Sequence, residues 1–128
     1  ERTRRSVMAS FISSGFHTNT QLLDQSGSLV SASDAFAGCD AVGVYFSAHW
    51  CGPCRQMAPA FAAAAAQLEP DIRLGKLDTE AEQAIAARFQ VRSIPSLILI
   101  SGGQERARTA GAMPAGSIVQ WVKASLPG

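Results

Sequence analysis

The hydrophobic positions in the first half of the chain change from strand-like to helix-like spacing. The run "AVGVYFS" (41–47) is β-branched and aromatic with little polar alternation, which predicts a strand buried on both faces. A long helix is expected next, over about residues 52–68. Its apolar stripe comprises Met57, Phe61, Ala64 and Leu68. Pro59 lies inside this helix and is expected to kink it, because proline lacks the backbone donor.

Weaker patterns lie on either side of these two elements. Before them, "SASDAFAG" (31–38) predicts a short helix with Ser33 as its N-cap and Gly38 as its stop. After them, the stretch "DIRLGKLD" (71–78) predicts another strand.

Two further helices are expected in the second half. Thr79 and Glu82 have the spacing of a capping box, which predicts a helix from there through about Arg88. The last helix is amphipathic, and its apolar side consists of Ile118, Val119, Val122 and Leu126.

A hairpin completes the expected fold. The runs "SLILIS" (96–101) and "ERARTAG" (105–111) flank Gly102-Gly103, a combination typical of two antiparallel strands. The order β-α-β-α-β-β-α predicts an α/β protein with a central mixed sheet and helices on both faces. We expect one domain over residues 21–128, preceded by a flexible extension over residues 1–20, which lack periodicity.

Composition narrows the function classes. Of the 128 residues, 47% are hydrophobic and 16% are charged, which favours a compact globular protein over a disordered one. The formal charge of +1 gives no support for binding to nucleic acid or to an anionic membrane. Three cysteines are too few for a secreted disulfide framework, so the close pair at 51 and 54 indicates redox chemistry or half of a metal site.

The cysteine pair follows a buried strand and opens a helix. At a helix N-terminus, free backbone N–H groups and the helix dipole stabilise an anion, so the pKa of Cys51 is expected to fall from about 8.5 to about 7 or below. Cys51 is therefore the expected nucleophile. Cys54 lies one turn further along the helix. It is expected to resolve the mixed disulfide that Cys51 forms with a substrate. Gly52 and Pro53 keep the connection tight, since proline in the first turn sacrifices no hydrogen bond.

A zinc site is the competing interpretation. The pair with nearby His49 supplies at most three ligands, and the remaining Cys39 and His17 have no recognisable zinc spacing. The strand-to-helix context favours the redox interpretation, with no metal and no bound cofactor. We interpret Cys39 as a small packing residue, with a regulatory thiol as the alternative.

These residues resemble a known family. The motif "WCGPCR" (50–55) is that of the thioredoxin active site, and the resemblance extends over roughly residues 22–126. It implies the thioredoxin fold, a cis bond between Ile94 and Pro95 beside the cysteines, and Gly111 lining a substrate groove. Trp50 is expected to form an apolar rim beside the nucleophile.

Within the family, two groups share features with this chain. The stretch "LDTEAEQAIAARFQVRSIPS" is most similar to the second type of bacterial thioredoxin, although the paired cysteines of its zinc segment are absent from this sequence. The stretches "LLDQSGSLV" and "YFSAHWC" resemble tryparedoxins and nucleoredoxins.

Three positions depart from the family pattern, of which one is His49 in place of a proline. Tyr45 occupies the strand position of a buried aspartate that accepts a proton from the second cysteine, and Ser47 replaces a common tryptophan. Without that negative charge the thiolate is less disfavoured, which predicts a couple more oxidising than about −270 mV. His49 is a candidate proton acceptor or thiolate partner, with an exposed ring of no special role as the alternative. Lys76 matches a family lysine and either favours the thiolate or faces solvent.

The resemblance implies a dithiol–disulfide oxidoreductase acting on disulfide-containing proteins. Its reductant is then an NADPH-dependent flavoenzyme of the thioredoxin-reductase kind, and the chain is expected to be a cytoplasmic monomer, although residues 1–20 are also consistent with the remnant of a longer precursor. The alternative is a docking module that uses the same groove without catalysis.

Phe89 and Trp121 are expected in the core, since they occupy helix-type positions.

Overall fold

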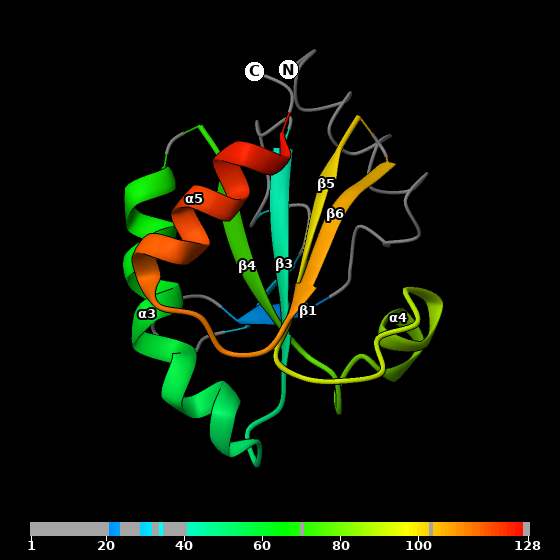
Figure 1. The fold of residues 1–128 in the computed structure, drawn as a ribbon. Helices are drawn as coiled ribbons and strands as arrows, with labels where there is room; N and C mark the ends of the chain where they lie inside the picture. The colour runs from blue at the N-terminus through cyan, green and yellow to red at the C-terminus, as the bar shows by residue number, and fades with distance from the viewer. Residues whose placement is uncertain are drawn as a thin grey trace.

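The computed structural model describes residues 21–23, 29–31, 34, 41–69, 71–102 and 104–126. These residues form one six-stranded sheet with the strand order β2-β1-β4-β3-β5-β6. Figure 1 shows β4, β3, β5 and β6 of this sheet. The strands are β1 (Gln21–Leu23), β2 (Leu29–Ser31), β3 (Ala41–Ser47), β4 (Arg73–Asp78), β5 (Ser96–Ser101) and β6 (Gln104–Ala110). The helices are α3 (Gly52–Leu68), α4 (Gln83–Arg88) and α5 (Ala115–Ser125).

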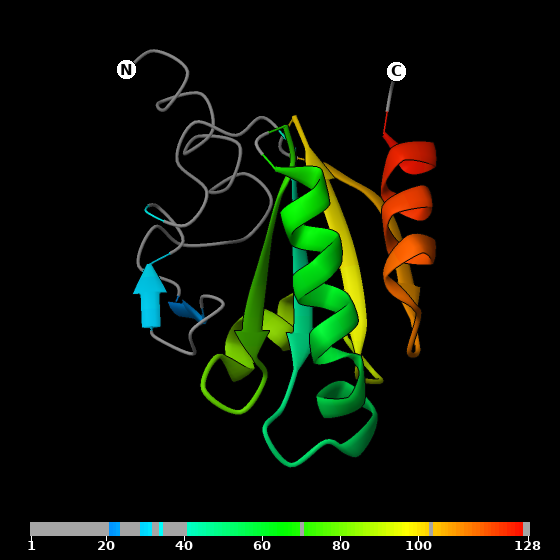
Figure 2. The same cartoon turned by 90° about the vertical axis from the view of Figure 1, so that its left-hand side faces the viewer.

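The sheet is mixed, as the sequence predicts. Strand β3 pairs in parallel with β4 and antiparallel with β5, and β5 pairs antiparallel with β6. Helix α3 connects the two parallel strands, which gives the expected βαβ half followed by a hairpin half. Helices α3 and α5 lie on one face of the sheet and α4 on the other (Figures 1 and 2). The order from β3 to α5 and the α/β class are therefore confirmed.

Strand β3 has no polar face because both sides of the sheet are covered. Val44 and Phe46 point into the core under α4, whereas Tyr45 points to the side of α3 and α5. The core on the α4 side is made of Leu22, Val42, Val44, Phe46, Leu77, Ile85, Phe89, Ile98 and Ile100. The core on the opposite side is made of Tyr45, Met57, Phe61, Ala64, Ala65, Leu68, Leu74, Leu97, Leu99, Ile118 and Val122. Each fully buried large apolar side chain contributes roughly 1.5–3 kcal/mol relative to an exposed one.

The long helix and both aromatic core predictions are also confirmed. Helix α3 spans the expected residues and continues through Pro59. Phe89 is buried in the first core, and Trp121 is partly buried against the second.

The predicted capping box is wrong. Helix α4 begins only at Gln83, and its N-cap, Glu82, makes no capping hydrogen bond through its side chain. Thr79 instead extends the end of β4, since its N–H donates to the carbonyl of Ser47 at 2.9 Å. The carboxylate of Asp78 then accepts from the N–H of Glu80 at 2.9 Å, which forms a turn where the helix was expected.

The opening strands were missed, because their three residues each are too short for a periodic pattern. The helix expected over 31–38 lies mostly outside the described residues, and Ser31 belongs to β2. The extension over 1–20 also lies outside them. None of the described helices combines the length and the hydrophobicity of a membrane-spanning segment.

Candidate active site

The cysteine pair lies where the chain passes from β3 into α3. A turn closed by the hydrogen bond from Cys51 N–H to the carbonyl of Ala48 (3.1 Å) reverses the chain after the strand. Cys51 is the N-cap of α3, with extended backbone angles, and Pro53 lies in the first turn of the helix. Proline is tolerated there because a first-turn N–H has no partner within the helix.

The two sulfurs meet at this helix end. Cys51 and Cys54 form a disulfide with a Cα–Cα distance of 5.3 Å. The N–H of Cys54 donates to Sγ of Cys51 at 3.2 Å, so the sulfur takes the acceptor position that a serine or aspartate usually has at an N-cap. Cys51 is 5% exposed and Cys54 is 2% exposed, and both pack against Ala48 and Ile94.

The loop before β5 faces the disulfide. The carbonyl oxygen of Ile94 lies 4.0 Å from Sγ of Cys51. The peptide bond between Ile94 and Pro95 is cis, which confirms that prediction. Pro95 is buried, and its carbonyl accepts from the N–H of Gly111 at 2.9 Å. Gly111 has a positive φ of 99°, a conformation that favours glycine.

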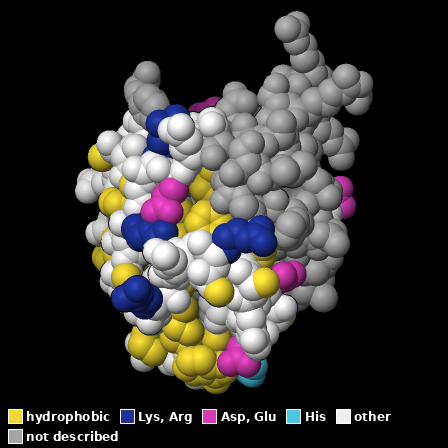
Figure 3. Space-filling model, turned by 90° about the vertical axis from the view of Figure 1, so that its right-hand side faces the viewer, with side chains coloured by type: hydrophobic (Ala, Val, Ile, Leu, Met, Phe, Trp, Pro, Cys, Tyr) yellow, Lys and Arg dark blue, Asp and Glu magenta, His cyan; other side chains and the backbone are white. Residues whose placement is uncertain are grey.

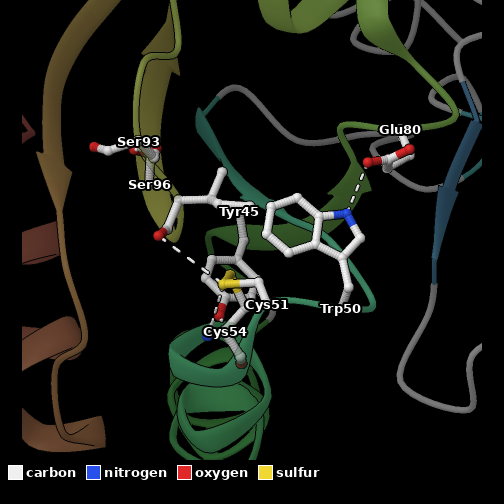
Figure 4. Close-up of a disulfide and its surroundings, with 8 residues drawn as sticks. Tyr45, Trp50, Cys51, Cys54, Glu80, Ser93 and Ser96 are labelled. Atoms are coloured by element: carbon white, nitrogen blue, oxygen red, sulfur yellow. Dashed lines mark hydrogen bonds between the residues drawn. A yellow bond between two sulfur atoms is a disulfide. The ribbon is translucent and has the colours of Figure 1, made fainter.

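Trp50 forms an exposed apolar surface beside Cys51. Its side chain is 60% exposed, and its Nε1–H donates to Oε1 of Glu80 at 2.7 Å (Figure 4). Hydrophobic side chains gather at this end of the molecule in the space-filling view (Figure 3). Gly52 and Pro53 are exposed next to them.

Glu80 was not anticipated from the sequence. Ser47 and Asp78 are register partners in the parallel strands β3 and β4, so the residues that follow each strand emerge side by side. The sequence predicts that β3 and β4 are parallel neighbours. This pairing was the signal that residues shortly after β4, such as Glu80, lie near Trp50.

Tyr45 lies directly beneath the start of α3. It is fully buried, its hydroxyl donates to the carbonyl oxygen of Cys54 at 3.0 Å, and its ring stacks on Phe61 at 4.4 Å between centroids. Burial raises the pKa of Tyr45 to about 12. The hydroxyl is therefore protonated at neutral pH and cannot act there as a base.

The other candidate tuning residues lie at different depths. Lys76 is the register partner of Tyr45 in β4 and is partly buried. Ser47 is only 1% exposed. His49 is exposed, and no hydrogen bond or ion pair joins it to another described residue.

Within the described ranges, no group of three or more histidines, cysteines or acidic residues could hold a metal ion. The zinc interpretation thus gains no support from them. Cys39 and His17 lie outside the described residues, so the packing role expected of Cys39 stays a prediction.

Comparisons with known proteins agree with this geometry. The thioredoxin family model matches residues 35–124. The chain is 37% identical over 95 residues to a thioredoxin of Mycoplasma pneumoniae, covering 74% of this chain and 92% of that protein. It is 46% identical over 79 residues to thioredoxin C-3 of Corynebacterium nephridii, of which it covers 54%.

A solved structure gives the same result. The oxidised mitochondrial thioredoxin 3 of Saccharomyces cerevisiae superposes with a TM-score of 0.62 and 29% sequence identity, over 67% of this chain and 79% of that one. The chain therefore belongs to the thioredoxin family and is a thiol–disulfide oxidoreductase of the thioredoxin type, with Cys51 and Cys54 as its redox pair.

Proposed function

We propose that the protein reduces disulfides in other proteins, with Cys51 as the nucleophile and Cys54 as the resolving residue. The observation that carries the assignment is the hydrogen bond from Cys54 N–H to Sγ of Cys51 at the N-terminus of α3. In the reduced protein the same donor and the helix dipole favour negative charge on that sulfur. The sulfur of Cys54 lies inside the helix and has no equivalent N-cap position.

The reaction transfers two electrons in two exchange steps. The thiolate of Cys51 attacks one sulfur of the substrate disulfide, and the other substrate sulfur leaves as a thiolate that takes up a proton. Cys54 then loses its proton and attacks Sγ of Cys51. The mixed disulfide breaks, the second substrate sulfur leaves as a thiolate, and the Cys51–Cys54 disulfide remains.

The substrate is expected to lie across the exposed rim of the site. Trp50, Gly52 and Pro53 offer apolar surface on one side of the sulfurs. On the other side, the main chain at Ile94 can pair with an extended substrate segment. We propose that the groove-lining and positioning residues are Trp50, Gly52, Pro53, Ile94, Pro95 and Gly111.

Proton handling is proposed to differ from that of thioredoxins with a buried aspartate. Tyr45 is neutral at pH 7, so Cys54 gives its proton to another acceptor, for which exposed His49 and water are the candidates. Lys76, on the same sheet face as Tyr45, adds positive charge on this side of the sheet. The lack of a carboxylate at Tyr45 and the positive charge of Lys76 both favour the thiolate form of the cysteine pair. A more stable thiolate makes the couple more oxidising.

The oxidised pair needs an external reductant, since the dithiol is the only redox group that the reaction uses. We propose an NADPH-dependent flavoenzyme of the thioredoxin-reductase kind, a cytoplasmic location and a monomeric domain over residues 21–128. We also propose kinship with the second type of bacterial thioredoxin, on the stretch from Leu77 to Ser96.

Insulin reduction tests the proposal. The wild-type protein is expected to reduce insulin disulfides in the presence of dithiothreitol, and Cys51→Ser is expected to be inactive. Cys54→Ser is expected to accumulate a mixed disulfide with insulin, visible by mass spectrometry. An inactive wild-type protein that still binds its partners would instead support the docking module.

A further inference from the structure

A β-bulge in β6 joins two charged residues that a regular strand would keep apart. Residues three apart in a strand point to opposite faces. Here Ile100 pairs with Glu105 while Leu99 pairs with Ala107, so Arg106 is an extra residue in the edge strand. Glu105 and Arg108 consequently share a face and form a bidentate ion pair, with both N–O distances 2.6 Å.

Arg108 also reaches from the sheet to helix α4. Its Nη2–H donates to the carbonyl oxygen of Phe89, the C-cap of α4, at 2.9 Å. The ring of Phe89 is buried and lies 6.2 Å from that of Phe46. The C-terminal end of α4 is therefore held at two points. The ring of Phe89 packs in the core, and the carbonyl of Phe89 accepts from Arg108.

This helix end is where the loop to the active site begins. The N–H of Gln90 donates to Ala87 and that of Val91 to Ala86, both at 3.0 Å, which is the hydrogen-bond pattern of a Schellman turn. The chain then runs to Ile94, whose carbonyl faces Cys51.

The far end of the same loop is also held by β6. Gly111, directly after that strand, donates to the carbonyl of Pro95. Ser96 Oγ donates to the carbonyl of Ser93 at 2.6 Å within the loop. Strand β6 thus contacts both ends of residues 89–95, at one end through its main-chain continuation and at the other through Arg108.

We propose that Arg108, oriented by Glu105, is a positioning residue for disulfide exchange: it fixes the loop that presents Ile94 to the substrate. The inference rests on the proposed function, in which that loop pairs with the main chain of a protein substrate. A displaced loop misaligns the substrate disulfide with Cys51, and small misplacements of reacting atoms cost rate steeply. A small disulfide makes no such pairing and is unaffected.

The test compares two disulfide substrates in three variants. For Arg108→Ala, the rate constant for insulin is expected to fall about fivefold, the factor that corresponds to one ordinary net hydrogen bond. The rate constant for Ellman's reagent and the redox potential are expected to stay unchanged. Arg106→Ala is the matched control: it removes an arginine from the same strand, but one that donates to Ser101 O at the opposite end. Glu105→Gln keeps Arg108 and is expected to show a smaller fall with insulin alone.

All rates are measured at a temperature where circular dichroism shows each variant to be folded. Equal insulin rates for wild type, Arg108→Ala and Glu105→Gln would overturn the proposal. A parallel fall with both substrates would also overturn it, since that is the result of a general structural role. Failure of the proposed function is distinguishable, because the wild-type protein itself would then not accelerate insulin reduction above the rate with dithiothreitol alone.

Discussion

The hydroxyl of Tyr45 and the carbonyl of Cys54 are joined by a buried hydrogen bond of 3.0 Å. The central strand thereby holds the first turn of α3 from beneath, next to the redox pair. A neutral donor lies where the resemblance to thioredoxins implies a carboxylate. It makes a fixed contact with Cys54 and cannot accept a proton at neutral pH.

The first prediction concerns alkaline stability. Burial raises the pKa of Tyr45 from 10.0 to about 12, so the folded protein holds this proton more tightly than the unfolded chain does. The stabilisation is fully present below pH 10 and is lost as the pH rises towards 12. We expect urea unfolding to show this loss in the wild type and to lack it in Tyr45→Phe. Since Tyr45 is the single tyrosine, its ultraviolet absorbance also reports the titration directly. A tyrosinate signal at pH 10 in the folded protein would contradict the assignment.

The second prediction concerns the redox potential. We expect the wild-type couple to be more oxidising than about −270 mV, the value typical of thioredoxin. Tyr45→Asp places a carboxylate beneath the sulfurs and should shift the potential to a more negative value, because a like charge disfavours the thiolate. Tyr45→Asn is the neutral control and should leave the potential near that of the wild type. Equilibration with glutathione measures all three, and identical potentials for the aspartate and asparagine variants would refute the electrostatic explanation.

The sequence predicted those parts of the site that depend on local chain order. Cys51 and Cys54 follow a strongly apolar strand and open a helix with an apolar stripe, so their place at a helix N-terminus could be inferred from spacing alone. The contacts of Tyr45 with Cys54, Trp50 with Glu80, and Arg108 with Phe89 could not. They join residues that are 9, 30 and 19 positions apart, and depend on how elements pack.

The error at α4 has a similar cause. Thr79 and Glu82 carry the local pattern of a capping box, but the N–H of Thr79 donates to the carbonyl of Ser47 at the end of the neighbouring strand β3. The tertiary contact between Thr79 and Ser47 thus overrides the local preference of residues 79–82 for a helix start.

The third prediction concerns packing beneath α3. A Cβ atom added at Gly43 would lie 2.5 Å from Cδ2 of Leu74 and 3.2 Å from Cδ2 of Leu99. We expect Gly43→Ala to lower the free energy of unfolding by about 1–3 kcal/mol, the usual cost of overpacking. Gly116→Ala is the matched control, because nothing lies within 4 Å of its added Cβ. Urea unfolding measures both variants. Equal free energies of unfolding would contradict the prediction and show that Leu74 and Leu99 shift to make room for the added methyl group at Gly43.

A fourth prediction concerns the Schellman turn after α4. Gln90 has a φ of 55°, a left-handed conformation that costs a side-chain-bearing residue about 1–2 kcal/mol. Gln90→Gly removes this strain but loosens the unfolded chain, so we expect a net stabilisation of about 0.5–1 kcal/mol. The same substitution at Gln67, an exposed position inside α3, should destabilise by about 1 kcal/mol. If thermal melts show that both glycines destabilise, the left-handed turn is not a source of strain.

The most direct test of the account is alkylation of the reduced protein by iodoacetamide as a function of pH, with the modified cysteine located by mass spectrometry. We expect Cys51 to react first, with a midpoint clearly below the value of about 8.5 for a free cysteine, while Cys54 stays protected. Equal reaction of Cys51 and Cys54 with the midpoint of a free thiol would contradict the claim that the end of α3 holds Cys51 as a thiolate.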